Sequence, residues 1–167
     1  MIYRVCHRIG PHKLSSNWNT RQEIEVCPDV LTFDGVYTEV YQHREFLKTK
    51  KRVILFIAGH YVGKDNSFDK EETLGLFCDW EALFKLKMDY GFELGWHSWS
   101  HRVLTTLTDE EVEKELTPPF HCKLLAWPYG NCNSRVANIA MSLGYTEAFS
   151  VNQGDGSQYQ RMRHYLN

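Results

Sequence analysis

The run Val53-Ile54-Leu55-Phe56-Ile57 constrains the fold more than any other stretch of the chain. Consecutive apolar residues in a strand point to opposite faces, so both faces of this strand must be covered. Strands of this kind belong to parallel sheets that carry helices on both sides. The run therefore predicts a parallel sheet or barrel in which strands alternate with helices.

Other short apolar runs alternate with amphipathic segments along the chain. The runs that predict strands, besides residues 53–58, are 2–6, 30–33, 92–96, 123–127 and 148–151. The segments that predict helices, because apolar residues recur on one face, are 38–48, 71–90, 108–116 and 133–143. This alternation predicts an α/β fold with largely parallel strands. Such folds bind ligands at the carboxyl ends of their strands.

The length and composition predict one globular domain over residues 1–167. The chain is 43% hydrophobic, and its formal net charge of −2 offers no basic surface for nucleic acid. Its five cysteines are an odd number without a CxxC pair, which favours reduced thiols and a cytoplasmic location. We also expect no signal peptide and no membrane span, because no apolar run has the required length.

Two histidines follow the predicted strand at 92–96. His97 and His101 are four residues apart, and on one turn of helix residues with this spacing share a face. Two imidazoles so placed can bind one divalent ion. The spacing alone is more often found in half-exposed histidines without a ligand, but the position at a strand end favours metal binding.

Two more motifs stand at strand ends. Asp34 is followed by Gly35, which is either a simple turn or a carboxylate that deprotonates a metal-bound water or ligates the metal. Pro128-Tyr129-Gly130 is either a plain loop or a turn in which the backbone N–H of Tyr129 holds an oxyanion.

The remaining histidines carry weaker signals. His164 lies in a basic segment near the C-terminus, so it is either a surface histidine, the reading we slightly favour, or a general acid for a leaving amine. His60 also follows a strand, so it either lines the pocket or, as we expect, packs in the core or at a rim. No role is predicted for a last group, His7, His12, His43 and His121.

In this order, the motifs resemble those of the polysaccharide deacetylases with a NodB-homology domain, carbohydrate esterase family 4. Leu31-Thr32-Phe33-Asp34-Gly35 is similar to the family's Thr-Phe-Asp-Asp-Gly motif, and His97-Ser98-Trp99-Ser100-His101 matches His-(Ser/Thr)-x-x-His. Leu125-Ala126-Trp127-Pro128-Tyr129-Gly130 is similar to its Pro-Tyr-Gly motif. The resemblance runs from about Val30 to the C-terminus.

The resemblance implies a deformed (β/α) barrel with fewer than eight units and a divalent metal of the zinc type. It implies removal of an N-acyl group, acetyl or formyl, from a sugar or glycan, so the expected partner is a carbohydrate. His97 and His101 match the metal-binding histidines, and Tyr129 matches the oxyanion donor. His164 matches the family's final histidine only loosely.

The chain departs from the family in its carboxylates. The family has two adjacent ones, a base and a metal ligand, whereas this chain has Asp34 followed by Gly35. Read without a gap, Asp34 is the base; read with a deletion, it is the ligand. The neighbouring Tyr37 and Tyr41 favour the reading without a gap. Ala126 also stands where the family often has an arginine.

Three hypotheses follow. The first is a metal-dependent deacylase acting on an N-acylated sugar or glycan. The second is a relative that has lost catalysis and binds carbohydrate without hydrolysing it, because one carboxylate is missing. The third is an α/β domain in which the histidine pair is structural.

Overall fold

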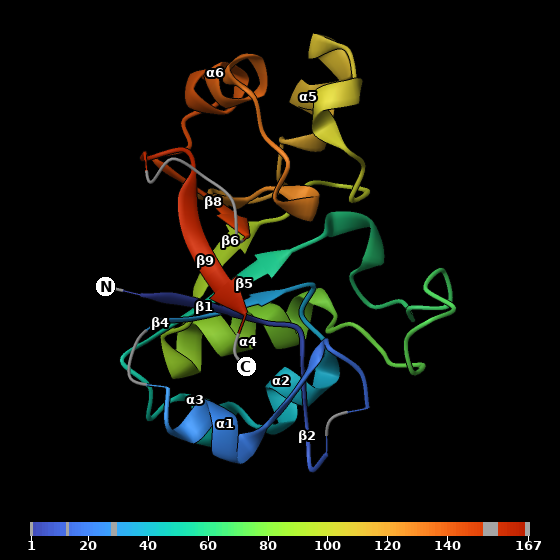
Figure 1. The fold of residues 1–167 in the computed structure, drawn as a ribbon, viewed down its shortest axis with the longest axis vertical. Helices are drawn as coiled ribbons and strands as arrows, with labels where there is room; N and C mark the ends of the chain where they lie inside the picture. The colour runs from blue at the N-terminus through green and yellow to red at the C-terminus, as the bar shows by residue number, and fades with distance from the viewer. Residues whose placement is uncertain (1, 13, 28–29, 152–156, 166–167) are drawn as a thin grey trace.

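The computed structural model describes residues 2–12, 14–27, 30–151 and 157–165. Seven parallel strands close into a barrel in the order β1-β4-β5-β6-β7-β8-β9, and β9 completes it by pairing with β1 (Figure 1). The strands are β1 (Tyr3–Cys6), β4 (Val30–Asp34), β5 (Arg52–Ile57), β6 (Glu93–Trp96), β7 (Leu124–Ala126), β8 (Glu147–Val151) and β9 (Arg161–Tyr165). The predicted α/β fold with a deformed, largely parallel barrel is confirmed.

The apolar run in β5 fills both faces of the barrel wall, as its sequence predicts. Ile54 and Phe56 belong to the apolar cluster inside the barrel, together with residues such as Phe149. Val53 and Leu55 belong to the larger cluster between the strands and the helices. Both sets are buried, so neither face of β5 meets water.

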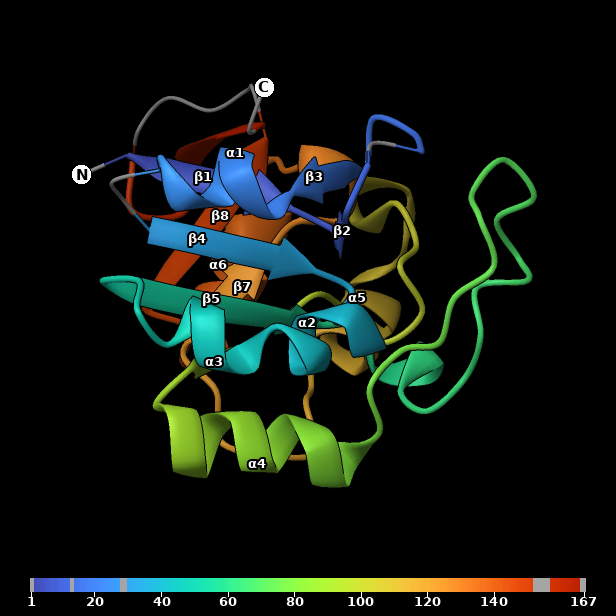
Figure 2. The ribbon, with the colours of Figure 1, turned by 90° about the horizontal axis from the view of Figure 1, so that it is seen from below.

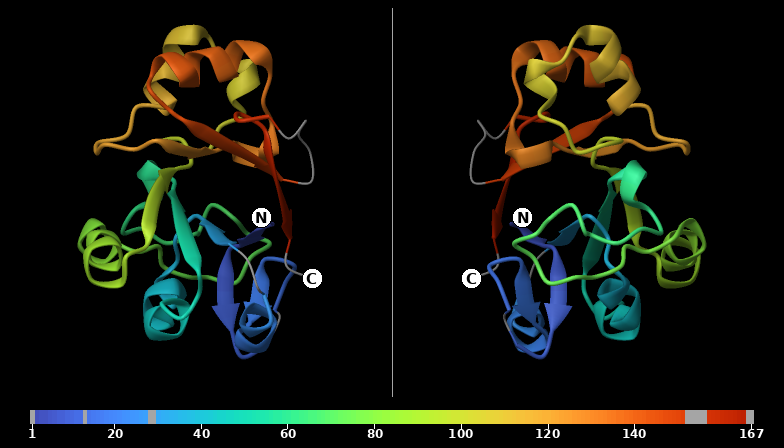
Figure 3. Two further views of the ribbon diagram at one scale, coloured as in Figure 1. Left: turned by 90° about the vertical axis from the view of Figure 1, so that its left-hand side faces the viewer. Right: turned by 90° about the vertical axis from the view of Figure 1, so that its right-hand side faces the viewer.

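The helices lie outside the barrel (Figure 3). In chain order they are α1 (Arg21–Glu25), α2 (Thr38–Gln42), α3 (Arg44–Leu47), α4 (Trp80–Tyr90), α5 (Asp109–Glu115) and α6 (Ser134–Ser142). Three short 3-10 turns follow strands β5 and β7 or precede α5: η1 (Gly59–Tyr61), η2 (Leu104–Thr106) and η3 (Pro128–Gly130). Thr108 caps α5 in a capping box with Glu111, and Asn133 caps α6.

The predicted helix over 71–90 is wrong in its first half. Only α4 is helical, and it begins where the Asp79 side chain accepts a hydrogen bond from the Ala82 N–H at 2.8 Å. The preceding residues form a long irregular loop with several turns, closed by an isolated antiparallel bridge between Asp65 and Leu76. Leu74 lies within the predicted helix but is not helical, and its side chain is 69% exposed. The predicted helix over 38–48 is likewise divided, at His43, into α2 and α3.

Three parts of the chain had no sequence prediction: a two-stranded ribbon, the helix that follows it and one barrel strand. Strands β2 (Arg8–Gly10) and β3 (Trp18–Thr20) pair in parallel as a separate two-stranded ribbon, and α1 follows it. The third is β9, whose residues seemed to be a basic tail; they are instead a barrel strand, and Arg163 within it is fully buried. A strand whose inward-facing residue is an arginine lacks the buried apolar residue by which a strand is usually predicted from sequence.

Candidate active site

A buried ion pair joins the end of β4 to the middle of β9. The Arg163 guanidinium donates from Nη1 to Asp34 Oδ1 at 2.5 Å and from Nη2 to Oδ2 at 2.7 Å. Its Nη1 also donates to Thr32 Oγ1 at 3.0 Å. Burial alone would raise the pKa of Asp34, but the Arg163 charge and then His97 hold that pKa well below its ordinary value. Asp34 is therefore ionised at neutral pH.

The histidine pair lies beside this carboxylate. His97 Nδ1 is 2.8 Å from the Ala126 carbonyl oxygen, so Nδ1 carries the proton and the Nε2 lone pair is available. His97 Nε2 is 3.1 Å from His101 Nε2 and 3.9 Å from Asp34 Oδ2. We call Asp34, His97 and His101 the Asp–His cluster.

The pair is not on a helix, which corrects the expected geometry. Ser98 and His101 both have left-handed backbone, with φ of 64° and 61°, and the Ser98 hydroxyl accepts a hydrogen bond from the His101 N–H at 2.9 Å. Two left-handed residues therefore fold the second imidazole back onto the first. Non-glycine residues adopt this backbone rarely, and often at functional sites.

Both imidazoles are neutral in this surrounding. Burial lowers the pKa of His97. Burial, and then the repulsion that two protonated rings would exert on each other, lowers the pKa of His101 to about 3. Neutral imidazole is the form that binds metals. The electrostatics of the pair therefore suit a cation and oppose protonation.

The donor atoms fit a divalent cation through two ligands. Their separation of 3.1 Å is close to the roughly 3.3 Å between two nitrogens on a tetrahedral zinc ion with bonds of about 2.0 Å. Asp34 is farther from His97 and already binds Arg163 with both oxygens. Within the described part of the chain, no group of three or more His, Cys, Asp or Glu side chains is arranged to hold a metal ion.

The predicted oxyanion turn follows β7 as η3. Tyr129 and Gly130 both have left-handed backbone, and the Ser150 hydroxyl donates to the Gly130 carbonyl at 2.8 Å. The Tyr129 ring packs against His101 with ring centres 4.6 Å apart. The turn therefore lies directly beside the histidine pair.

These groups line one cavity of about 510 Å³. Its remaining walls are largely aromatic, with Tyr37, Tyr61, Phe68, Phe77, Trp127 and Tyr165. The cavity also contains His7, Asn17 and Asp69. A pocket of this size that combines aromatic walls with converging polar groups is typical of a small-molecule or sugar site.

The structure places His7, and not the predicted His164, in the wall of the cavity. His164, the candidate general acid, is exposed and does not line the cavity, because side chains alternate along β9 and Arg163 points inward. His7, for which no role was predicted, lines the cavity just after β1. Burial lowers the pKa of His7. His60 is exposed, with its ring 5.1 Å from that of Tyr61, so it lies at the rim.

A comparison with protein families decides what this site belongs to. The family model described as "Polysaccharide deacetylase" matches residues 28–148, which include the Asp–His cluster and Tyr129. The chain belongs to the polysaccharide deacetylase family. Arg163 lies beyond the matched residues, which is one reason why motif reasoning did not find it.

Solved structures share the deacetylase fold over nearly the whole chain. The deacetylase PplD of Streptococcus pyogenes, in complex with acetate, has a TM-score of 0.77 at 13% identity and covers 99% of this chain and 92% of its own. IcaB from Ammonifex degensii has a TM-score of 0.74 at 15% identity, covering 99% and 90%. At these identities the likeness concerns the fold.

One curated relative matches a shorter stretch of this deacetylase-family chain. Chitin deacetylase 1 of Cryptococcus neoformans var. grubii is 36% identical over 76 residues, which are 40% of this chain and 16% of that protein. Among the helices of the described residues, none is long and apolar enough to cross a membrane. All five cysteines are free thiols.

Proposed function

We propose that this family member is a metal-dependent hydrolase that removes an N-acyl group, most simply acetyl, from a sugar or glycan. One observation carries the proposal: an ionised carboxylate and two neutral imidazoles converge in a cavity of about 510 Å³. The names of the relatives, a chitin deacetylase and an acetate-bound deacetylase, favour acetyl among acyl groups. We further propose a single domain and keep the cytoplasm as the predicted location.

Asp34 is proposed as the general base. It accepts a proton from the water whose oxygen attacks the acyl carbon, and Arg163 fixes the direction of its carboxylate. The engagement of both Asp34 oxygens by Arg163 supports the base over the ligand interpretation. In addition, this arginine supplies a guanidinium at the site although Ala126 stands where the family often has one.

His97 and His101 are proposed to hold the divalent metal, for which zinc suits imidazole ligands. A cation there would act as a Lewis acid toward the acyl carbonyl oxygen. The Ala126 carbonyl orients His97 through Nδ1, which leaves the Nε2 lone pair available to bind the metal.

Two further groups complete the proposed mechanism. The backbone N–H of Tyr129 stabilises the negative charge that develops on the acyl oxygen. When the carbon–nitrogen bond breaks, the leaving amine needs a proton, and His7 is the cavity imidazole proposed to relay to it the proton that Asp34 takes from the attacking water. His164 is no longer proposed for this role, since it lies outside the cavity.

A second candidate function is carbohydrate binding without hydrolysis. It is favoured by the donor set, because two imidazoles bind a metal less well than three protein ligands. The two candidates predict different turnover with the same glycan.

The test uses metal-free protein reconstituted with Zn²⁺, assayed for bound zinc and for acetate release from N-acetylglucosamine oligomers. We expect one zinc ion per chain and release of acetate, both lost in His97→Ala and both kept in the exposed control His60→Ala. Glycan binding without acetate release would overturn hydrolysis and support the second candidate. Unchanged zinc content in His97→Ala would show that the pair is structural.

A further inference from the structure

One wall of the cavity comes from a long irregular loop, residues 63–77, which we call the wall segment. It reaches out from the barrel between η1 and α4, in green at the right of Figure 2. Asn66, fully buried, holds it together: its amide donates to the Thr73 carbonyl at 3.1 Å and accepts from the Gly75 N–H at 2.7 Å. The segment is therefore an ordered loop with its own internal bonds.

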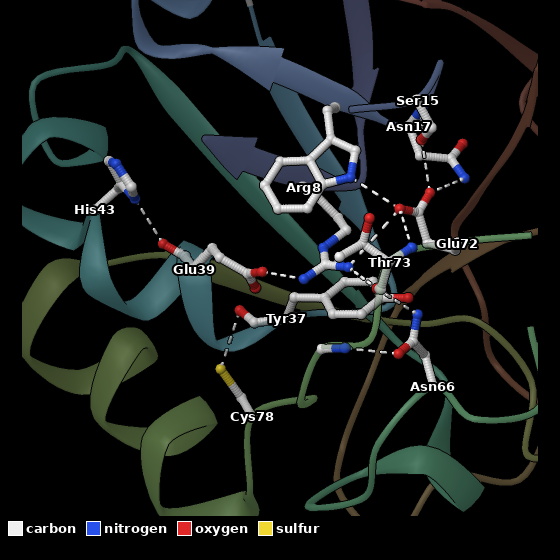
Figure 4. A network of polar contacts seen from close by, with 12 residues as sticks. Arg8, Ser15, Asn17, Tyr37, Glu39, His43, Asn66, Glu72, Thr73 and Cys78 are labelled. Carbon is white, nitrogen blue, oxygen red and sulfur yellow. Dashed lines mark hydrogen bonds and ion pairs between the residues drawn. The ribbon is translucent and has the colours of Figure 1, made fainter. Parts of the chain in front are cut away.

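Arg8 of the β2–β3 ribbon fastens this segment to the barrel. Its side chain, 2% exposed, donates to the Thr73 carbonyl and pairs with Glu39 of α2 (Figure 4). Its guanidinium lies 4.2 Å from the centre of the Trp18 ring and 4.4 Å from that of Tyr37. A planar guanidinium can stack and donate at once, which an ammonium cannot reproduce.

Glu72 makes the second attachment. Its carboxylate accepts hydrogen bonds from Ser15 Oγ at 2.6 Å, Trp18 Nε1 at 2.8 Å and Asn17 Nδ2 at 3.0 Å. Its Oε1 is 3.8 Å from Arg8 Nη1. Burial opposes its charge, but these hydrogen bonds lower the pKa of Glu72 below its ordinary value. The wall segment is thus tied to the ribbon by a charged network.

An aromatic stack continues from Arg8 to the mouth of the cavity. Tyr37 packs on Phe77 with centres 4.2 Å apart, Phe77 on Tyr61 at 5.8 Å, and Tyr61 on Phe68 at 4.3 Å. Phe68 lines the cavity and is nevertheless 56% exposed. An aromatic face carries partial negative charge and attracts the C–H bonds on the flat face of a pyranose.

We propose that the Phe68 ring stacks on the flat face of the sugar ring to which the acyl group is attached. Arg8 is the positioning residue that holds the wall segment, and with it Phe68, at the cavity. The proposal rests on the proposed function, since it concerns the same cavity. The ligand it names is a pyranose with an apolar face, as in N-acetylglucosamine.

The first experiment compares Phe68→Ala with Leu74→Ala, an exposed apolar residue of the same segment that does not line the cavity. The probe is an N-acetylglucosamine oligomer, with Kd from calorimetry and KM and kcat from acetate release. We expect Phe68→Ala to raise Kd and KM by about three- to tenfold with kcat nearly unchanged. Leu74→Ala should match the wild type. Equal values in the two variants would overturn the role of Phe68.

The second experiment tests the positioning by Arg8. In Arg8→Lys and Glu72→Gln, trypsin should cleave the folded protein faster after Lys70, and KM should rise as in Phe68→Ala. Glu72→Gln keeps the shape of the side chain, so it decides the matter if Arg8→Lys does not fold. If cleavage and KM equal those of the wild type, the positioning role of Arg8 and Glu72 is overturned. A wild type that binds the oligomer without releasing acetate would overturn only hydrolysis, and the Kd and cleavage results would still test this inference.

Discussion

The Asp–His cluster and the wall segment face the same cavity, but they are built differently. The cluster consists of residues at or just after strand ends, so the register of a parallel barrel brings them together. The wall segment belongs to no regular element and is held by side chains of β2, β3 and α2. We therefore expect substitutions at the strand ends to change turnover and substitutions in the wall segment to change substrate binding.

The largest expected effect separates the two regions by turnover. Asp34→Asn removes the proposed base, so acetate release should fall by about 10²- to 10⁴-fold. Asp69→Asn, a carboxylate of the wall segment in the same cavity, should leave kcat within a few-fold. The measurement is kcat with zinc content, and retained zinc in Asp34→Asn supports the base interpretation. Loss of zinc with activity would make Asp34 the ligand and contradict the proposed roles.

The same contrast explains what the sequence could predict. The barrel, Asp34, His97, His101 and Tyr129 follow from short apolar strands and local motifs, each readable within a few residues. Arg163 could not be found this way, because its partner Asp34 is 129 residues away and the pair forms only when β9 closes the barrel. No sequence pattern in β9 marks Arg163 as the inward-facing residue, because the apolar Met162 beside it is exposed while the arginine is buried.

The wall segment misled the sequence analysis for a physical reason. Leu74 and Phe77 of the segment and the next residue, Cys78, have helical spacing, yet the chain there is not helical and only Phe77 and Cys78 are buried. The Glu72 carboxylate accepts a hydrogen bond from Trp18 of the ribbon, and the Asn66 amide donates one to the Thr73 carbonyl of the segment itself. These bonds replace the backbone hydrogen bonds that a helix would have. Hydrogen bonds between distant parts of the chain outweigh a weak local preference.

Replacing one glycine in the barrel and one in the wall segment compares how much each region contributes to stability. A Cβ at Gly95 of β6 would lie 2.4 Å from the Phe56 ring inside the barrel, whereas one at Gly75 would lie 2.2 Å from Arg8 Nη2. Gly95→Ala should lower the free energy of unfolding by about 1–3 kcal/mol, because the barrel interior cannot give way. Gly75→Ala should change it less and mainly speed cleavage after Lys70. Urea unfolding checks both, and an equal loss would show that the wall segment is part of the cooperative core.

The smallest expected effect concerns pH. Burial lowers the pKa of His97, so the folded protein keeps it neutral, while the unfolded chain protonates it below about pH 6.5. The unfolded state then binds the extra proton, and the free energy of unfolding falls with pH by about 1.4 kcal/mol per pH unit for that proton. In chelator, His97→Gln should reduce this slope between pH 6.5 and 5.5, whereas His60→Ala, exposed beside the wall segment, should not. Equal slopes for the wild type and His97→Gln would mean that the cluster end of the barrel is open to water, and the low dielectric on which the proposed electrostatics depend would be absent.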